Sequence, residues 1–127
     1  MTRRILIVDD EPSIVISLEF LMKREGFEVA VAGDGEAALR ALAERPVHLV
    51  ILDVMLPKLN GFDVCRRIRA EPAWRGLRIL MLTAKGRETE MARGLELGAD
   101  AYLTKPFSTK ELVAEIHRLL PAGEATP

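Results

Sequence analysis

The sequence is poor in cysteine and has no excess of charge of either sign. Cys65 is its one cysteine, so an internal disulfide framework is excluded, and no cysteine–histidine cluster has the spacing of a zinc site. The formal net charge of −1 gives no signature of nucleic-acid or membrane binding. No apolar run is long enough to span a membrane, and the first ten residues lack the uninterrupted apolar core of a signal peptide. We therefore expect a cytoplasmic protein.

The residues that are present describe one globular domain with alternating strands and helices. The chain has 127 residues, of which 49% are apolar and 29% charged. Short β-favouring runs lie at Ile5–Val8, Glu28–Ala32, His48–Asp53, Arg78–Thr83 and Ala101–Thr104. The first, third and fourth runs are apolar on both faces, as is typical of strands buried on both sides of a parallel sheet.

Segments with helical periodicity follow each of these runs. They centre on Ile14–Met22, Ala37–Leu42, Phe62–Ile68, Met91–Leu95 and Ser108–Leu120. Five alternations of strand and helix predict a three-layer α/β fold with right-handed crossovers.

Chemically active side chains stand at the ends of four of the five runs. The first run is followed by Asp9 and Asp10, the third ends in Asp53, the fourth in Thr83, and Lys105 follows the fifth. Because the carboxyl ends of parallel strands form the ligand crevice of an open sheet, and neighbouring strands lie about 5 Å apart, these side chains are predicted to converge.

The three carboxylates point to metal and phosphate chemistry. Crowded carboxylates repel one another and raise one another's pKa unless a cation lies between them. A hard divalent cation with oxygen ligands, Mg²⁺ above all, suits such a site and fills its remaining positions with water and phosphate oxygens. One carboxylate is then available as a nucleophile that forms an acyl phosphate, with a lysine and a hydroxyl for the oxygens of the transferred group.

Four stretches match a known family. "ILIVDDE", "LVILDVMLPKLNGFDVCRRIR", "ILMLTA" and "GADAYLTKPFS" strongly resemble the receiver domain of two-component response regulators, which has the CheY-like, flavodoxin-type fold. The resemblance is closest to receivers of winged-helix (OmpR/PhoB-type) transcription factors. It implies a (βα)5 fold with strand order 2-1-3-4-5, a receiver domain over residues 1–120, and a flexible tail or linker start over residues 121–127.

The resemblance also implies which residues take part in phosphorylation. Asp53 matches the phosphoacceptor, which receives a phosphoryl group from a partner histidine kinase or phosphotransfer protein in a Mg²⁺-dependent reaction. Asp10 matches the direct Mg²⁺ ligand, together with Asp53 and the backbone carbonyl of Met55. Asp9 is expected to assist the ion through water, and Lys105 to contact the phosphoryl group.

The resemblance further implies a switch. Thr83 matches the switch hydroxyl and Tyr102 the aromatic residue that follows it, and the bond from Lys105 to Pro106 is expected to be cis. The surface of the fourth helix, fifth strand and fifth helix is expected to bind a downstream protein target. Such a domain assists its own phosphorylation and dephosphorylation, but it is not expected to be an enzyme that converts a metabolite.

Simpler interpretations exist for each residue taken alone. Asp10 could cap the first helix and Asp53 could close an Asx turn, while a threonine or a lysine in such places is often just a strand residue or a solvated charge. A haloacid-dehalogenase-type phosphohydrolase also uses a strand-tip aspartate, but it needs a second acid where Met55 stands. A degenerate receiver that serves only for docking is opposed by the complete residue set. His48, His117 and Cys65 are interpreted as structural.

The sequence departs from the winged-helix subfamily on its expected output surface. Met91 and Glu115 stand where the resemblance leads us to expect arginines, and Ala101 where it leads us to expect an acid. We therefore predict a monomer or a weak phosphorylation-dependent dimer, and a more apolar surface near Met91, Leu95 and Ala101 for another contact. No helix-turn-helix or basic face follows Leu120, so we predict a stand-alone receiver without direct nucleic-acid contact. The alternative is the N-terminal receiver of a longer DNA-binding transcription factor.

Overall fold

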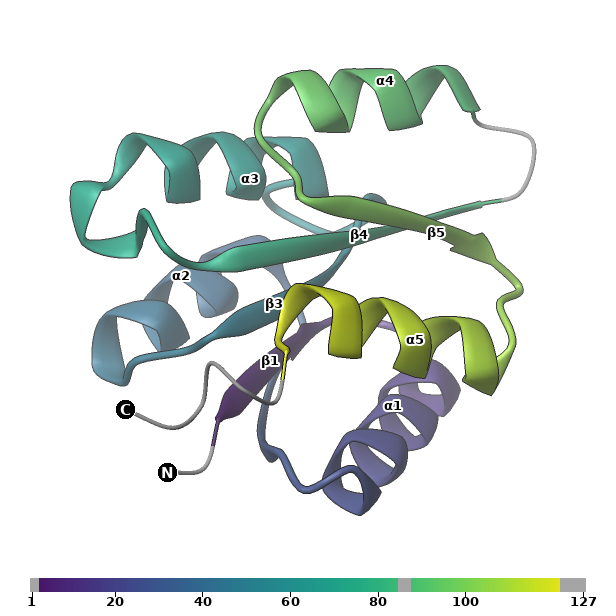
Figure 1. Cartoon of the computed structure of the whole chain (residues 1–127). Coiled ribbons are helices and arrows are strands. Elements are labelled where there is room, and N and C mark those ends of the chain that lie inside the picture. Colours follow the sequence, from purple (N-terminus) through teal and green to yellow (C-terminus); the bar gives the residue numbers. More distant parts are fainter. Residues whose placement is uncertain (1–2, 85–87, 122–127) are drawn as a thin grey trace.

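A central parallel sheet organises the molecule (Figure 1). The computed structural model describes residues 3–84 and 88–121, with the side chains of 88–91 outside the description. Within these ranges the strands are β1 (Arg4–Val8), β2 (Glu28–Ala32), β3 (Leu49–Asp53), β4 (Arg78–Ala84) and β5 (Ala101–Lys105). All neighbouring pairs are parallel, in the order β2-β1-β3-β4-β5. The predicted fold class, strand order and edge position of the second strand are confirmed, and no strand end differs from its predicted place by more than one residue.

Helices cover both faces of the sheet, with α1 and α5 on one side and α2, α3 and α4 on the other (Figure 1). Their bounds are α1 (Pro12–Arg24), α2 (Gly35–Glu44), α3 (Gly61–Ala70), α4 (Glu88–Glu96) and α5 (Thr109–Leu119), with a short 3-10 turn at Pro72–Trp74. Pro12 opens α1, and Ser108 and Glu111 form a capping box at the start of α5. Both helix starts therefore depend on local sequence.

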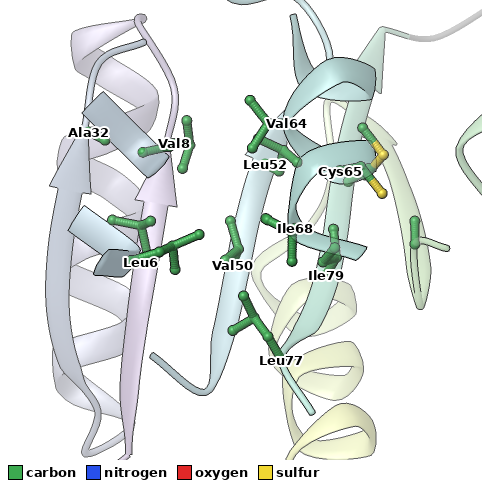
Figure 2. Close-up of a cluster of buried hydrophobic side chains, with 14 of the residues drawn as sticks. Leu6, Val8, Ala32, Val50, Leu52, Val64, Cys65, Ile68, Leu77 and Ile79 are labelled. Atoms are coloured by element: carbon green, nitrogen blue, oxygen red, sulfur yellow. The ribbon is translucent and has the colours of Figure 1, made fainter. Parts of the chain in front are cut away.

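The core forms one layer on each side of the sheet. Leu6, Val50 and Ile79 pack with α2 and α3 on one face (Figure 2), and the intervening strand residues pack with α1 and α5 on the other. Strands β1 and β3 are therefore buried over nearly their whole length, as their apolar sequences predicted. Burying one such side chain contributes about 1.5–3 kcal/mol. Since polar groups are excluded from the interior of these strands, the strand ends carry the chemistry.

Arg69 fastens the segment that leads into β5. Its Nε donates to the carbonyl of Gly98 at 2.8 Å, and its Nη1 donates to the carbonyl of Leu77 at 2.7 Å. Its Nη2 lies 2.7 Å from Asp100 Oδ2, which also accepts the backbone N–H of Ile79 at 2.7 Å. Asp100 is thus engaged inside the domain by a charge-assisted pair and a backbone hydrogen bond.

One expectation about the output surface is wrong. Ala101 is only 6% exposed, and it packs in the cluster of α1 and α5. Successive side chains of a strand point to opposite faces, so Ala101 faces that cluster while Tyr102 packs on the α2–α3 side. Ala101 therefore adds nothing to an exposed apolar surface. Leu95 is 50% exposed, and the Met91 side chain lies outside the described residues.

The residues interpreted as structural have structural contacts. His48 Nδ1 accepts the backbone N–H of Arg4 at 3.0 Å, and His117 Nε2 lies 2.9 Å from Glu25 Oε1. Cys65 is fully buried in the core. In the part of the chain that is described, no helix is long and apolar enough to cross a bilayer.

Candidate functional site

Three carboxylates meet at the carboxyl edge of the sheet. Asp9, Asp10 and Asp53 each place one carboxylate oxygen within 4.8 Å of the others. Asp9 follows β1 and Asp53 ends the neighbouring strand β3, so the parallel pairing of the two strands brings the side chains together. Asp9 and Asp53 are 1% and 6% exposed, while Asp10 lies exposed at the rim. The convergence of carboxylates predicted from the strand ends is confirmed.

Lys105 supplies the positive charge of this cluster. Its Nζ lies 3.1 Å from Asp9 Oδ2 and 3.4 Å from Asp53 Oδ2. The side chain is 21% exposed, and it starts from the last residue of β5. The bond to Pro106 is cis, as the family resemblance implied. The lysine therefore faces both buried carboxylates from across β4.

The electrostatics of the cluster are set by burial and by unequal charge. Burial raises the pKa of the Asp53 carboxyl and the Asp9 charge adds to the effect, while Lys105 opposes both. Burial alone would lower the pKa of the Lys105 ammonium, but the charges of Asp53 and Asp9 outweigh it and raise that pKa. Among the described residues, the cluster holds three carboxylates and the Lys105 ammonium, which leaves an excess of negative charge.

The donor set of the cluster suits a hard cation. The ligand atoms are all carboxylate oxygens, and the exposed Asp10 leaves the rim of the cluster open to solvent. Met55 borders the same edge, because its backbone N–H donates to Asp53 Oδ1 at 3.3 Å and its side chain is 59% exposed. The residues present therefore fit Mg²⁺ with water or phosphate completing its coordination.

Thr83 lies on β4, which pairs with the Asp53 strand β3, and Tyr102 lies on β5, the next strand outward. Thr83 is 1% exposed near the end of β4, where it pairs in register with Thr104 of β5. Tyr102 is half-buried on β5 and pairs with Met81. Their positions are those of the predicted switch pair, and their roles stay predictions.

Gly61 is a residue that the sequence analysis missed. A Cβ on Gly61 would lie 2.8 Å from Cα of Val54 and closer still to the carbonyl oxygen of Asp53. Glycine therefore lets α3 begin directly against the end of β3. The preceding Asn60 caps the helix, its Oδ1 accepting the N–H of Asp63 at 2.9 Å. The pair "NG" after the strand was the available signal.

The match to a family model decides what this site belongs to. The model of the response regulator receiver domain matches residues 5–117. The chain belongs to that family. Receiver domains act in two-component signalling and bind Mg²⁺ at an acidic pocket, which here is the cluster of Asp9, Asp10 and Asp53.

The relatives of this receiver are longer proteins. The DNA-binding response regulator MtrA of Mycolicibacterium smegmatis is 49% identical over 127 residues, which are 100% of this chain and 54% of that protein. The chain thus spans about half the length of the curated relatives it matches.

Solved structures agree with the fold of the receiver. A putative response regulator from Chloroflexus aurantiacus has a TM-score of 0.90 at 38% identity, covering 94% of this chain and 98% of that one. The receiver domain of the sensor histidine kinase PA1611 from Pseudomonas aeruginosa has a TM-score of 0.85 at 30% identity, covering 94% and 98%. That structure contains a magnesium ion coordinated in its active-site cleft.

Of the simpler interpretations, the one for Asp10 fails and the one for Asp53 holds in part. The N-cap of α1 is Glu11, without a side-chain cap, so Asp10 does not cap that helix. Asp53 does accept the N–H two residues on, as an Asx turn would. That contact uses Oδ1 and leaves Oδ2 to Lys105, so in the receiver the turn and the acidic cluster share one side chain.

The receiver also has an apolar groove beside the site, which the sequence analysis missed. Ile16 and Phe20 on α1 are each 67% exposed. Phe20 lines a cavity of about 420 Å³ whose wall also includes Lys105 and Phe107; we call it the α1 groove. The available signal was Phe20, an apolar residue that lies off the apolar face of Ile14, Leu18 and Met22 in the predicted helix. Lys105 thus belongs both to the groove and to the carboxylate cluster.

Proposed function

We propose that Asp53 is the phosphoacceptor of a signalling switch and that it takes a phosphoryl group from a histidine kinase or phosphotransfer protein. The observation that carries the proposal is the contact between a buried carboxylate and a lysine ammonium, 3.4 Å apart, at the edge where Asp9 and Asp10 also lie. A buried, crowded carboxylate with a counter-charge suits nucleophilic attack on phosphorus. The same carboxylate on an exposed loop would be hydrated, and no neighbouring group would hold it in position for attack.

The transfer conserves atoms and charge. An Asp53 carboxylate oxygen attacks the phosphorus of the donor's phosphohistidine, a P–O bond forms, the P–N bond breaks, and the electron pair leaves with the imidazole nitrogen. Lys105 turns to the phosphoryl oxygens, where negative charge is spread in the transition state. Asp10, Asp53 and the backbone carbonyl of Met55 would hold Mg²⁺, with Asp9 acting through water. The ion supplies further neutralisation of that charge.

Phosphorylation then changes the charge balance that holds the site together. A phosphoryl group adds negative charge at Asp53, which draws Lys105 away from Asp9. Thr83 follows Leu82, the register partner of Asp53 on β4, and its hydroxyl moves toward the phosphoryl group. Tyr102 lies on β5, the strand next to β4. The surface formed by α4, β5 and α5 then shifts its population between two conformations, and this surface binds the downstream target.

The direct test is covalent labelling. The wild-type protein, incubated with acetyl phosphate and Mg²⁺, is expected to gain the mass of one phosphoryl group, and peptide mapping is expected to place it on Asp53. The small donor removes any need for a partner kinase. A label on another residue, or none at all, contradicts the proposal.

Two acids near the expected output surface are occupied within the domain. Asp100 pairs with Arg69, and Glu111 Oε1 accepts the N–H of Ser108 in the capping box. Positions 91 and 115 also lack the arginines that the resemblance led us to expect, so charge pairs expected of a dimer contact are missing. We predict that the protein sediments as a monomer, or as a weak dimer, with and without beryllofluoride and Mg²⁺. Analytical ultracentrifugation checks this, and a tight dimer that forms only with beryllofluoride contradicts it.

The α1 groove is proposed to receive the phosphodonor protein. A donor that delivers phosphohistidine to Asp53 must cover the region of Lys105, and the groove offers apolar surface at that place. Truncating an aromatic anchor of an interface typically lowers affinity by 2 kcal/mol or more, about 30-fold. We expect Phe20→Ala to slow phosphotransfer from the cognate kinase about 30-fold at subsaturating concentration, while labelling by acetyl phosphate stays as in wild type.

Val31→Ala is the matched control for Phe20→Ala, since Val31 is exposed on the edge strand β2. It is expected to leave both reactions unchanged. An equal loss with kinase and with acetyl phosphate would place the effect of Phe20 in the site itself, and an unchanged kinase reaction would remove the groove as the docking surface.

The domain is proposed to act without direct nucleic-acid contact. We propose residues 1–120 as the receiver and residues 121–127 as a tail or the start of a linker. The stand-alone arrangement stays a prediction. The length of the relatives favours the alternative, in which this receiver controls a DNA-binding region of a longer regulator.

A further inference from the structure

Gly94 in α4 lies against the ring of Tyr102. A Cβ on Gly94 would lie 2.5 Å from Tyr102 Cε2 and 2.8 Å from Cζ, and closer still to the hydroxyl oxygen. Real Cβ atoms do not approach other atoms so closely. The tyrosine ring therefore occupies space that exists only because position 94 carries no side chain.

Backbone conformation does not explain this glycine. The positive-φ glycines of the described chain are Gly26 and Gly98, and Gly94 has ordinary helical geometry within α4. Glycine is unfavourable in a helix interior compared with alanine, because it loses more backbone freedom on folding. The close approach of the ring accounts for a glycine here, because the three atoms nearest to an added Cβ all belong to Tyr102.

The contact joins the two elements that the proposed switch must couple. Tyr102 belongs to β5, one strand from Thr83, and its ring packs on the α2–α3 side of the sheet. Gly94 is buried on the face of α4 that meets this ring. The Arg93 guanidinium lies 4.7 Å from the centre of the Phe62 ring, which adds a contact between α4 and α3. The helix α4 is therefore held both by the Tyr102 ring and by its contact with α3.

We propose that Gly94 is a positioning residue of the switch: its missing side chain forms the seat that holds the Tyr102 ring against α4. Occupation of this seat ties the ring to the position of α4. A methyl group at position 94 expels the ring from the seat without any change at Asp53. The inference rests on the proposed switch role of Tyr102, but the seat itself is independent of phosphorylation.

A spectroscopic test follows from the composition, because Tyr102 is the chain's one tyrosine. Protein labelled with 3-fluorotyrosine gives one fluorine resonance, which reports the surroundings of this ring. In the unphosphorylated protein, Gly94→Ala is expected to move the resonance by more than its line width. Gly76→Ala is the matched control, since a Cβ there meets nothing within 4 Å, and it is expected to leave the resonance in place.

Thermal unfolding of a double-mutant cycle separates the seat from a general helix effect. With Tyr102 present, Gly94→Ala is expected to lower the melting temperature by about 4 °C or more, because the added methyl group overpacks the site. With Tyr102→Ala, the same substitution is expected to raise the melting temperature, since alanine is the better helix former. A rise in both backgrounds, or an unmoved fluorine resonance in Gly94→Ala, overturns the seat.

The same labelled protein tests the switch separately. Beryllofluoride with Mg²⁺ is expected to shift the fluorine resonance of the wild type, and to shift that of Gly94→Ala by less than half as much. If the wild-type resonance ignores beryllofluoride while labelling of Asp53 succeeds, the switch role of Tyr102 is overturned and Gly94 is only a packing residue. If the two proteins shift equally, Gly94 does not position the ring for the switch.

Discussion

Asp53→Asn abolishes labelling by acetyl phosphate. An amide oxygen is a poor nucleophile and cannot form the acyl phosphate. The asparagine side chain is therefore not expected to be phosphorylated even slowly. Intact-mass measurement after incubation with acetyl phosphate and Mg²⁺ is expected to show no phosphoryl adduct. Asp63→Asn is the matched control, because Asp63 is an aspartate on α3 whose ion pair joins it to Arg66. It is expected to label like the wild type, and a labelled Asp53→Asn protein contradicts the assignment.

Asp53→Asn abolishes labelling, but it is expected to raise the stability of the folded protein. The pKa of Asp53 is raised in the folded protein, chiefly by burial, so folding penalises its charged form. The penalty is present at pH values above the folded-state pKa and vanishes as the pH falls below the unfolded-state pKa. At pH 7 without Mg²⁺, Asp53→Asn is therefore expected to melt at a higher temperature than the wild type, and the difference is expected to disappear in acid. A lower melting temperature at pH 7 would mean that the pair with Lys105 outweighs the burial.

Magnesium stabilises the wild-type protein and not Asp10→Ala. An ion that binds the native state alone adds about 1.4 kcal/mol when its concentration is about ten times the dissociation constant. For a chain of this length the shift in melting temperature is about 5 °C. Asp10→Ala removes the exposed member of the carboxylate cluster and is expected to reduce both the shift and the rate of phosphorylation, the latter by about 100-fold.

The control for the magnesium experiment is Glu36→Ala, an exposed acid in the first turn of α2. It is expected to keep the full magnesium shift, whereas general screening of surface charge would act on all variants alike. A wild-type melting temperature that ignores magnesium, or an equal rise in Asp10→Ala, contradicts the metal assignment.

The carboxylate cluster was predictable because it depends only on where the strands end in the sequence and on their parallel direction. The apolar runs that lead to Asp9 and Asp53 are buried on both faces, so they had to be central parallel strands, and parallel strands end at the same edge. Once the strands are parallel, no side-chain packing detail is needed to bring those residues together. The capping box at Ser108 was predictable for a similar reason, because its contacts lie within four residues of the chain.

The errors and omissions concern residues whose surroundings come from distant segments. Ala101 was expected at the surface, but the strand alternation turns it into the cluster of α1 and α5. The sequence did not show that Asp100 pairs with Arg69, which lies 31 positions earlier on α3. Phe20 was not singled out from the sequence, and only the placement of α1 beside Lys105 makes it part of a groove.

The sequence by itself determined the fold class, the sheet edge that carries the chemistry, and the identity of the charged residues there. Periodicity and residue type are local properties of the sequence. They suffice to predict where the strands end and which residues stand at those ends. Only the tertiary structure decided which carboxylates are buried, which acids are already paired, and that Gly94 makes room for Tyr102. Burial, ion pairing and steric fit depend on contacts between segments far apart in the chain, and these exist only after the helices have packed on the sheet.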